Sequence, residues 1–242
     1  MKSFCFKTII VILVLMSSPL VTGQILGGQI VKKKFKCSAN VRGTAKEFMC
    51  YNLGVTGGTQ DPLSYQGGLN NGGLYQWGRT TDGHEVRNSP TTSGPVAAAV
   101  AGRFIIIGFP QIDWISPQNN SLWLDASKTA NDPCPAGFRV PTKAQWAGLF
   151  KDGVESAGPG AAYYNTWTWT GSGFRVGSSL YLPAAGLRLN NGEISGEGTS
   201  GFYWSSTVSG TDVYSTNFVS GTIDLYVPYF RANGLSVRCI SE

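Results

Sequence analysis

The sequence predicts an α+β fold that is poor in helix, with short antiparallel strands and long loops. Of the 242 residues, 32 are glycine and only 14% are charged, whereas an average globular domain is about 25% charged. Low charge and abundant glycine argue against long solvated helices and coiled coils. Aromatic residues make up 12% of the chain. This is far more than disordered chains contain, so we expect a packed core.

The first 23 residues have the pattern of a secretory signal peptide. A basic start with Lys2 and Lys7 is followed by a short apolar run over residues 8–16 and by small residues that end at Gly23. The run is too short to cross a bilayer, so we expect cleavage near Gly23 rather than a retained anchor. No later segment is long and apolar enough to span a membrane. We therefore predict a protein that is secreted or held at the cell surface, without a transmembrane segment in the mature chain.

Charge gives no reason to expect a nucleic-acid partner. The net charge is +5, and it falls to +3 when Lys2 and Lys7 leave with the signal peptide. The positive run over residues 32–36 is short, and we interpret it as part of a solvated strand and linker over residues 24–45. No internal repeat of about 20 to 50 residues is convincing. Residues 46–242 are accordingly predicted to form one domain.

Turn signals fill the first part of this domain. Residues 54–95 contain repeated Gly-Gly, Asn-Gly and Asp-Gly pairs, so we expect mostly loop there. A short helix is predicted weakly over residues 95–101. The clearest helix lies between Pro141 and Gly153, with Thr142 as its N-cap. One apolar face of this helix is formed by Trp146, Leu149 and Phe150.

The second part of the domain reads as strands. Asn190-Asn191-Gly192 stands between two apolar segments and predicts a β-hairpin. The alternate residues Trp167 and Trp169 fit a strand that buries one face better than a sugar-stacking platform. Four further short antiparallel strands are predicted over residues 201–208, 213–219, 222–227 and 235–240.

Four cysteines remain after the signal peptide is removed, and in an exported protein we expect them to form disulfides. Three pairings are possible. Spacing favours Cys37 with Cys50 as a small local loop and Cys134 with Cys239 as a long clasp. The alternative is a zinc site with four thiolates, which we consider weaker because the chain has no Cys-x-x-Cys pair.

Several sequence blocks carry a resemblance to a known family. They are Phe48-Met-Cys-Tyr-Asn-Leu-Gly54, Gly73-Leu-Tyr-Gln-Trp-Gly-Arg79, Asp132-Pro-Cys-Pro-Ala-Gly-Phe-Arg-Val-Pro-Thr142, Leu182-Pro-Ala-Ala-Gly186, Tyr203-Trp-Ser-Ser-Thr207 and Ser236-Val-Arg-Cys239. In this order, from residue 46 to the end, the chain resembles the Fibrobacter succinogenes major paralogous domain, which is common in exported proteins of Bacteroidetes and Fibrobacteres. The resemblance implies a C-type-lectin-like fold, distantly similar to formylglycine-generating enzymes. It also implies that the domain termini lie close together and are clasped by Cys134 and Cys239.

The sequence does not predict an enzyme. The formylglycine-generating enzymes need free cysteine thiols in their C-terminal part, and Cys239 is expected in the clasp. The single histidine, His84, lies in a polar turn without a Gly-x-Ser-x-Gly nucleophile elbow, so we interpret it as a surface or loop-stabilising residue. No cofactor and no metal ion is predicted, because the Glu-Pro-Asn, Gln-Pro-Asp and Trp-Asn-Asp triplets of calcium-dependent lectins are missing. Asn131 with Asp132, and Asp82 with Glu85, stay open as ion ligands, although loop caps are the simpler interpretation.

The C-terminal strands and loops are the predicted binding surface. They are rich in Tyr, Ser, Thr, Asn and Asp, the residue types that adaptable binding surfaces use. The same composition resembles the variable regions of proteins diversified by adenine-directed retroelement mutagenesis. The predicted ligand-binding residues are Asp212, Tyr214, Asn217, Asp224, Tyr226, Tyr229, Arg231 and Asn233.

We expect this surface to bind a protein or a glycan. For any one of these residues, an ordinary polar position on a sheet remains the simpler interpretation. Two other functions stay open. One is a structural component of an outer-surface assembly that is joined through residues 24–46, and the other is an oxidase related to the formylglycine-generating enzymes.

Overall fold

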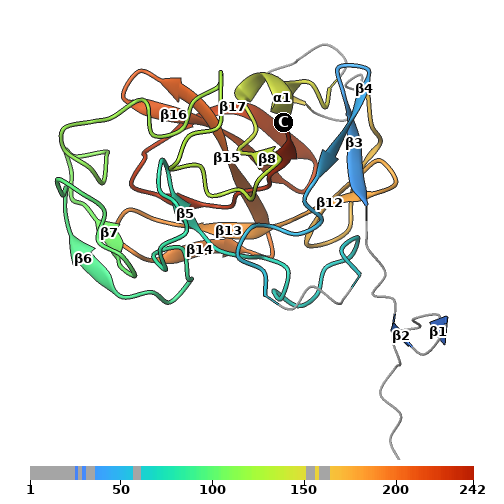
Figure 1. Cartoon of the computed structure of the whole chain (residues 1–242), viewed down its shortest axis with the longest axis horizontal. Helices are drawn as coiled ribbons and strands as arrows, with labels where there is room; N and C mark the ends of the chain where they lie inside the picture. Colours follow the sequence, from blue (N-terminus) through green and yellow to red (C-terminus); the bar gives the residue numbers. More distant parts are fainter. Residues whose placement is uncertain (1–24, 27–28, 31–35, 57–60, 151–155, 158–163) are drawn as a thin grey trace, which may run out of the picture. The chain divides into compact units, whose positions relative to one another are not determined.

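The computed structural model describes residues 25–26, 29–30, 36–56, 61–150, 156–157 and 164–242, and the predicted signal peptide therefore lies outside the described residues. The chain divides into two compact units, Met1–Lys34 and Phe35–Glu242 (Figure 1). In the first unit, β1 (Ile25–Leu26) and β2 (Gln29–Ile30) form an antiparallel pair.

The second unit begins earlier than the expected residue 46. Its first strand, β3 (Cys37–Val41), pairs along its whole length with β4 (Thr44–Phe48). Next to β4 lies β19 (Ile240–Ser241), which also pairs with β8 (Phe138–Arg139). The start and the end of this unit are therefore hydrogen-bonded in one four-stranded sheet.

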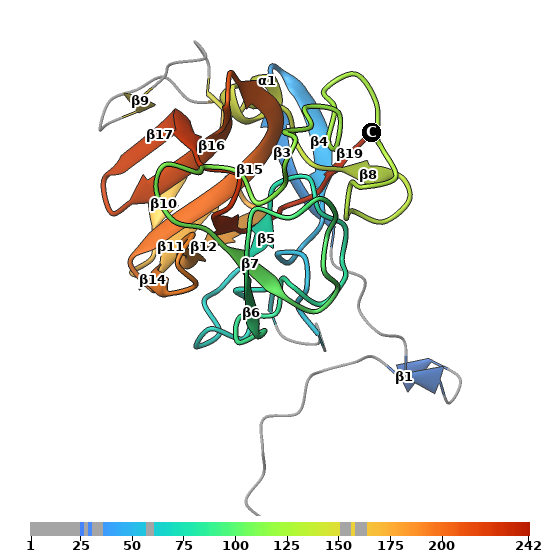
Figure 2. The ribbon, with the colours of Figure 1, turned by 90° about the vertical axis from the view of Figure 1, so that its left-hand side faces the viewer.

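The largest sheet runs in the order β5-β18-β13-β15-β16-β17-β9, with β14 paired to β13. Long strands β15, β16 and β17 form its antiparallel centre, and Figure 2 shows them beside α1. Its members are β5 (Tyr75–Gln76), β18 (Gly234–Leu235), β13 (Ala185–Arg188), β14 (Ile194–Glu197), β15 (Ser200–Ser209), β16 (Asp212–Val219), β17 (Thr222–Tyr229) and β9 (Ser156–Ala157).

Two smaller sheets complete the unit. One is antiparallel, and the other is a short parallel pair. Their strands are β10 (Trp167–Trp169), β11 (Gly173–Val176) and β12 (Leu180–Pro183) in the first, and β6 (Thr91–Ser93) and β7 (Phe104–Ile106) in the second.

The helix α1 (Lys143–Ala147) is the one α-helix among the described residues. As predicted, Thr142 caps it: the Thr142 hydroxyl accepts a hydrogen bond from the Gln145 amide, and the Gln145 side chain accepts one from the Thr142 amide. The helix is shorter than expected and ends at the C-cap Gly148. Its predicted apolar face, which includes Trp146, is buried.

The weak helix predicted over residues 95–101 does not form. Val96 instead forms a β-bridge with Ile115, and its amide donates to the carbonyl of Trp114. The Val96 carbonyl, which a helix would use as an acceptor, instead accepts the Ser116 amide. The hairpin at residues 190–192 is confirmed by the antiparallel pairing of β13 with β14.

Three of the last four predicted strands are confirmed as β15, β16 and β17, while the fourth, over residues 235–240, divides into β18 and β19 in different sheets. Strands β15 to β17 separate two hydrophobic clusters. Tyr203 packs in the cluster with Trp146 of α1, and its neighbour Trp204 packs in the cluster with Trp77. This alternation follows from the two-residue period of a strand.

Two disulfides fix the ends of the unit. Cys37 is bonded to Cys50, with an S–S distance of 2.14 Å, and Cys134 is bonded to Cys239, with an S–S distance of 2.04 Å. This is the pairing that spacing favoured over a zinc site. The second disulfide holds the loop before β8 against the C-terminal segment, so it supports the same end-to-end contact that β19 makes with β4.

Candidate functional site

Asp82, His84 and Glu85 form a group of potential metal ligands among the described residues. Their ligand atoms are already engaged. The Nδ1 of His84 lies 2.7 Å from Asp82 Oδ1, and its Nε2 accepts the Gln76 amide at 3.1 Å. Glu85 accepts the Gly83 amide at 2.9 Å. The group therefore closes a loop and does not fit a metal centre, and His84 stabilises this loop from a fully buried position.

Charge reinforces this conclusion. The guanidinium of Arg79 lies 2.7 Å from Asp82, on the carboxylate that a cation would need. Burial would raise the pKa of Asp82, but hydrogen bonds from His84 and Arg79, together with the charge that His84 carries when protonated, outweigh burial and lower the pKa to about 2. Burial lowers the pKa of His84, against the opposing hydrogen bond from Asp82. A neutral His84 that donates from Nδ1 and accepts at Nε2 fits both contacts.

A second interior cluster surrounds Arg238, which is fully buried. Its guanidinium donates to Asn52 Oδ1 at 2.6 and 3.0 Å, and to the carbonyls of Met49 and Cys50 at 3.1 and 2.9 Å. Burial lowers the pKa of Arg238 to about 10 and raises that of the neighbouring Tyr203. All the acceptors are protein groups in fixed positions. This cluster ties the segment after β4 to the C-terminal segment.

Two of the eight predicted binding residues are buried. Arg231 is 1% exposed and Asn233 is 5% exposed. The guanidinium of Arg231 donates to the carbonyl of Thr211 at 3.0 Å and to Asn120 Oδ1 at 2.7 Å, and it lies 4.6 Å from the Trp77 ring centroid. Arg231 therefore joins the turn after β15 to a neighbouring loop and presents little surface to a ligand.

The other six predicted residues are half-buried and divide between the two faces of the sheet. Directly paired residues of antiparallel strands point to the same face. Asn217 pairs with Phe202 on one side and with Asp224 on the other. Val213 pairs with Tyr229, and the side chain of Val213 lies in the cluster of Trp204 and Trp77. Asn217, Asp224 and Tyr229 therefore share the face on which Trp204 packs.

We call Phe202, Asn217, Asp224 and Tyr229 the open-face patch. The rings of Phe202 and Tyr229 meet edge to face at 5.7 Å. Asn217 Oδ1 accepts the Ser215 hydroxyl at 3.0 Å. Burial raises the pKa of Tyr229, and a hydrogen bond from Asn217 opposes this shift. These contacts fix both rings and the carboxamide, so the patch is rigid and remains partly exposed.

The remaining three residues lie on or beside the face that α1 covers. Tyr214 and Tyr226 meet nearly perpendicularly at 6.2 Å, and the Lys143 ammonium lies 3.8 Å and 3.9 Å from their ring centroids. Asp212 lies two residues before Tyr214, at the start of β16. Burial raises the pKa of Asp212, and the charge of Arg231 opposes the shift.

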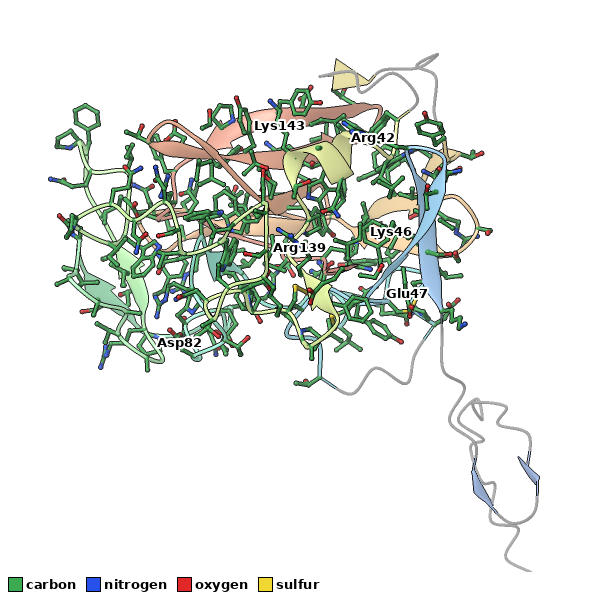
Figure 3. All side chains as sticks on the ribbon, turned by 45° about the horizontal axis from the view of Figure 1, so that its top comes forward. Arg42, Lys46, Glu47, Asp82, Arg139 and Lys143 are labelled. Atoms are coloured by element: carbon green, nitrogen blue, oxygen red, sulfur yellow. A yellow bond between two sulfur atoms is a disulfide. The ribbon has the colours of Figure 1, made fainter. Side chains whose placement is uncertain are left out.

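Lys143 belongs to a larger surface cluster. Its amide donates to the Thr207 hydroxyl at 2.9 Å, and this hydroxyl contacts the two carboxylate oxygens of Asp125 at 2.9 and 2.7 Å. Ser206 also donates to Asp125. We call Asp125, Lys143, Thr207, Tyr214 and Tyr226 the Lys143 cluster. In Figure 3, Lys143 lies at α1, far across the view from Asp82.

Sequence reasoning found only part of these two sites. Tyr214 and Tyr226 were predicted, but Phe202, Asp125, Lys143 and Thr207 were not. The Thr142 cap correctly placed Lys143 at the start of a helix, but no sequence spacing indicates that this helix lies over β16 and β17. Asp125 precedes β8 in a loop and reaches Thr207 only through the tertiary fold.

Comparisons with known proteins do not identify a family. No family model, no curated protein and no solved structure matches the chain. Among the described residues, none of the helices has the length and apolar character that crossing a membrane requires.

Proposed function

We propose that the chain is an exported, non-enzymatic binding module with a C-type-lectin-like fold, of the Fibrobacter succinogenes major paralogous domain type, that recognises a protein or glycan ligand through β15 to β17 and the adjoining loops. One observation carries the proposal. Six predicted binding residues are half-buried, and five of them lie in two fixed patches, one on each face of these strands. Rigid aromatic rings beside short polar groups give contact area at a low entropic cost.

The fold supports the C-type-lectin-like part of the proposal. The unit is poor in helix and rich in antiparallel strands, as the resemblance implies. Its two ends pair through β4 and β19, and Cys134 is joined to Cys239. Long irregular segments connect these strands.

The chemistry of the described residues supports a module without catalysis. An oxidase of the formylglycine-generating type would need a free thiol, and Cys239 is disulfide-bonded. Both ring nitrogens of His84, the single histidine, are used within the protein. Neither group is available as a nucleophile or general base in this arrangement.

Export is supported by two disulfides, because such bonds persist mainly in oxidising compartments. It is also supported by the signal-peptide pattern of the first 23 residues. Retention at the cell surface and release into the medium both agree with these observations.

Array binding tests this function. The chain starting at Gln24 is applied to arrays of glycans and of extracellular proteins, together with two patch variants. The first variant carries Asp224→Ala and Tyr229→Ala, and the second carries Tyr214→Ala and Tyr226→Ala. Val86, which is 50% exposed, supplies the matched control Val86→Ala.

We expect a ligand that binds the wild type and the control but is lost from at least one patch variant. A ligand that binds all four proteins equally would place the binding surface elsewhere. Absence of any ligand on both arrays would contradict the proposed function.

A further inference from the structure

The Lys143 cluster holds two opposite charges that do not neutralise each other directly. In the described part of the chain, no carboxylate lies within 4.0 Å of the Lys143 ammonium, and no Lys, Arg or His nitrogen lies within that distance of Asp125. The Thr207 hydroxyl stands between the Lys143 amide and the Asp125 carboxylate. By contrast, Lys128 forms an ion pair with Asp132 at 2.9 Å.

Both charged groups are held in position by the fold. Asp125 is exposed, yet hydroxyls of Ser206 and Thr207 fix its carboxylate. The ammonium of Lys143 is fixed by its contacts with the Tyr214 and Tyr226 rings at 3.8 and 3.9 Å. A lysine on a surface helix normally samples many rotamers, so these contacts reduce the entropy that a ligand would have to remove.

The arrangement selects among ligand classes by charge. Thr207 joins the Lys143 backbone amide to the Asp125 carboxylate, so an anionic ligand at Lys143 would also approach Asp125, and a cationic ligand at Asp125 would also approach Lys143. A neutral ligand with adjacent hydroxyl groups satisfies both, since one hydroxyl donates to the carboxylate and another accepts from the ammonium. Apolar ring faces beside such polar groups suit a pyranose, whose C–H face is apolar and whose edge is polar.

We propose that the Lys143 cluster is a binding site for a neutral saccharide, without a metal ion. Asp125 accepts hydrogen bonds from the sugar hydroxyls, Lys143 donates to them, and Tyr214 and Tyr226 form the apolar wall. The inference rests on the proposed function and names the ligand class for one of its two patches. It assigns ligand contacts to Asp125 and Lys143, which the sequence did not indicate.

Affinity electrophoresis in native gels tests the inference. The probes are three neutral polysaccharides (a mannan, a galactan and a β-glucan) and two acidic polymers (polygalacturonate and dextran sulfate), each cast into the gel with EDTA present. We expect at least one neutral polymer to retard the wild-type chain. Oligosaccharides of that polymer then provide dissociation constants by calorimetric titration.

The variants are Lys143→Met and Asp125→Asn. Methionine keeps the length and apolar stem of the lysine, and asparagine keeps the shape of the carboxylate and, through its Oδ1, can still accept from Ser206 and Thr207. We expect each variant to weaken binding by about tenfold or more, the range typical of a lost charged hydrogen bond. Val86→Ala, at an exposed position outside both patches, is the matched control and should bind like the wild type, while Tyr229→Ala reports on the open-face patch on the other side of the sheet. Near-ultraviolet circular dichroism confirms that each variant is folded.

The outcomes separate this inference from the proposed function. Neutral binding that is lost with Tyr229→Ala but kept with Lys143→Met overturns the inference and leaves the binding module intact. Retardation by the acidic polymers alone, or dependence on a divalent cation, also overturns it. No retardation by any polymer overturns the inference too, while a protein ligand on the arrays would still support the proposed function.

Discussion

The interior clusters and the Lys143 cluster use similar residues in opposite ways. Around Arg238, carbonyl and carboxamide oxygens of the protein accept the guanidinium donors, and the cluster is buried. Around Lys143, the ammonium has aromatic rings but no carboxylate among its described ion-pair partners, and Asp125 is exposed. A polar group that is hydrogen-bonded inside the chain stabilises the fold, whereas a fixed charge with no ion-pair partner among the described residues is suited to a ligand.

The largest effect on stability should come from removing the disulfide between Cys134 and Cys239. Replacing Cys134 and Cys239 by serine opens a loop with a sequence separation of 105 residues. We expect the free energy of unfolding to fall by about 4–5 kcal/mol in the chain-entropy model. Urea denaturation under oxidising conditions measures it. A loss below about 1 kcal/mol would show that β19 holds the C-terminal segment without the disulfide.

Arg238→Met tests how much the buried Arg238 cluster contributes to stability. The change removes the guanidinium that donates to Asn52 Oδ1 and to the carbonyls of Met49 and Cys50, so we expect a loss of about 2–4 kcal/mol in the free energy of unfolding. Saccharide binding measured below the unfolding transition should be unchanged. Arg238→Lys is the control for charge, and it should recover only part of the loss because an ammonium cannot span all the acceptors. Near-neutral stability in Arg238→Met would refute the interior role.

A pH titration tests the other interior cluster. The pKa of His84 is lowered on folding. As the pH falls through about 6.5, the unfolded chain therefore binds a proton at His84 while the folded chain does not. Stability should therefore decrease from pH 7 toward pH 5, by no more than about 1.4 kcal/mol per pH unit for one proton. His84→Gln should flatten this slope, because His84 is the single histidine.

A second decrease is expected at lower pH. The pKa of Asp82 is lowered to about 2 from 3.8, so its stabilising contribution is present above pH 3.8 and is lost as the pH falls toward 2. Thermal melts at half-unit pH steps measure both windows. An identical pH profile in wild type and His84→Gln between pH 7 and 5 would contradict the assignment of the first window to His84.

The smallest effect on stability should come from Lys143→Met. Each cation–π contact of a half-exposed ammonium contributes about 0.5–1 kcal/mol, and methionine retains part of the packing. We therefore expect the midpoint of thermal unfolding to shift by only a few degrees. A loss as large as that of Arg238→Met would place Lys143 among the structural residues and would remove the contrast between the two clusters.

The sequence predicted what local chemistry determines and missed what the tertiary fold brings together. The Thr142 cap, the hairpin at residues 190–192 and three long C-terminal strands depend on neighbouring residues, and they form as predicted. Arg231 and Asn233 were selected by composition, which carries no information on burial. Their position after the end of β17 places them inside the protein.

The Lys143 cluster could not be predicted from the sequence either, because tertiary packing brings its members together. Its members come from the loop before β8, from α1 and from β15 to β17, and residues 125 and 226 are remote in sequence. Their proximity results from the packing of α1 on the sheet, which no single motif encodes. Tyr214 and Asn217 are three residues apart on β16, so the two-residue period of the strand places them on opposite faces.

Lysine footprinting reports directly on whether a saccharide occupies the Lys143 cluster. The folded chain is reductively methylated with and without a saturating neutral saccharide identified in the gels, and modification at Lys143, Lys46 and Lys128 is compared by mass spectrometry of peptides. We expect the saccharide to slow methylation of Lys143 severalfold and to leave the methylation of Lys46 and Lys128 unchanged. Equal methylation of Lys143 with and without the bound saccharide would contradict this expectation.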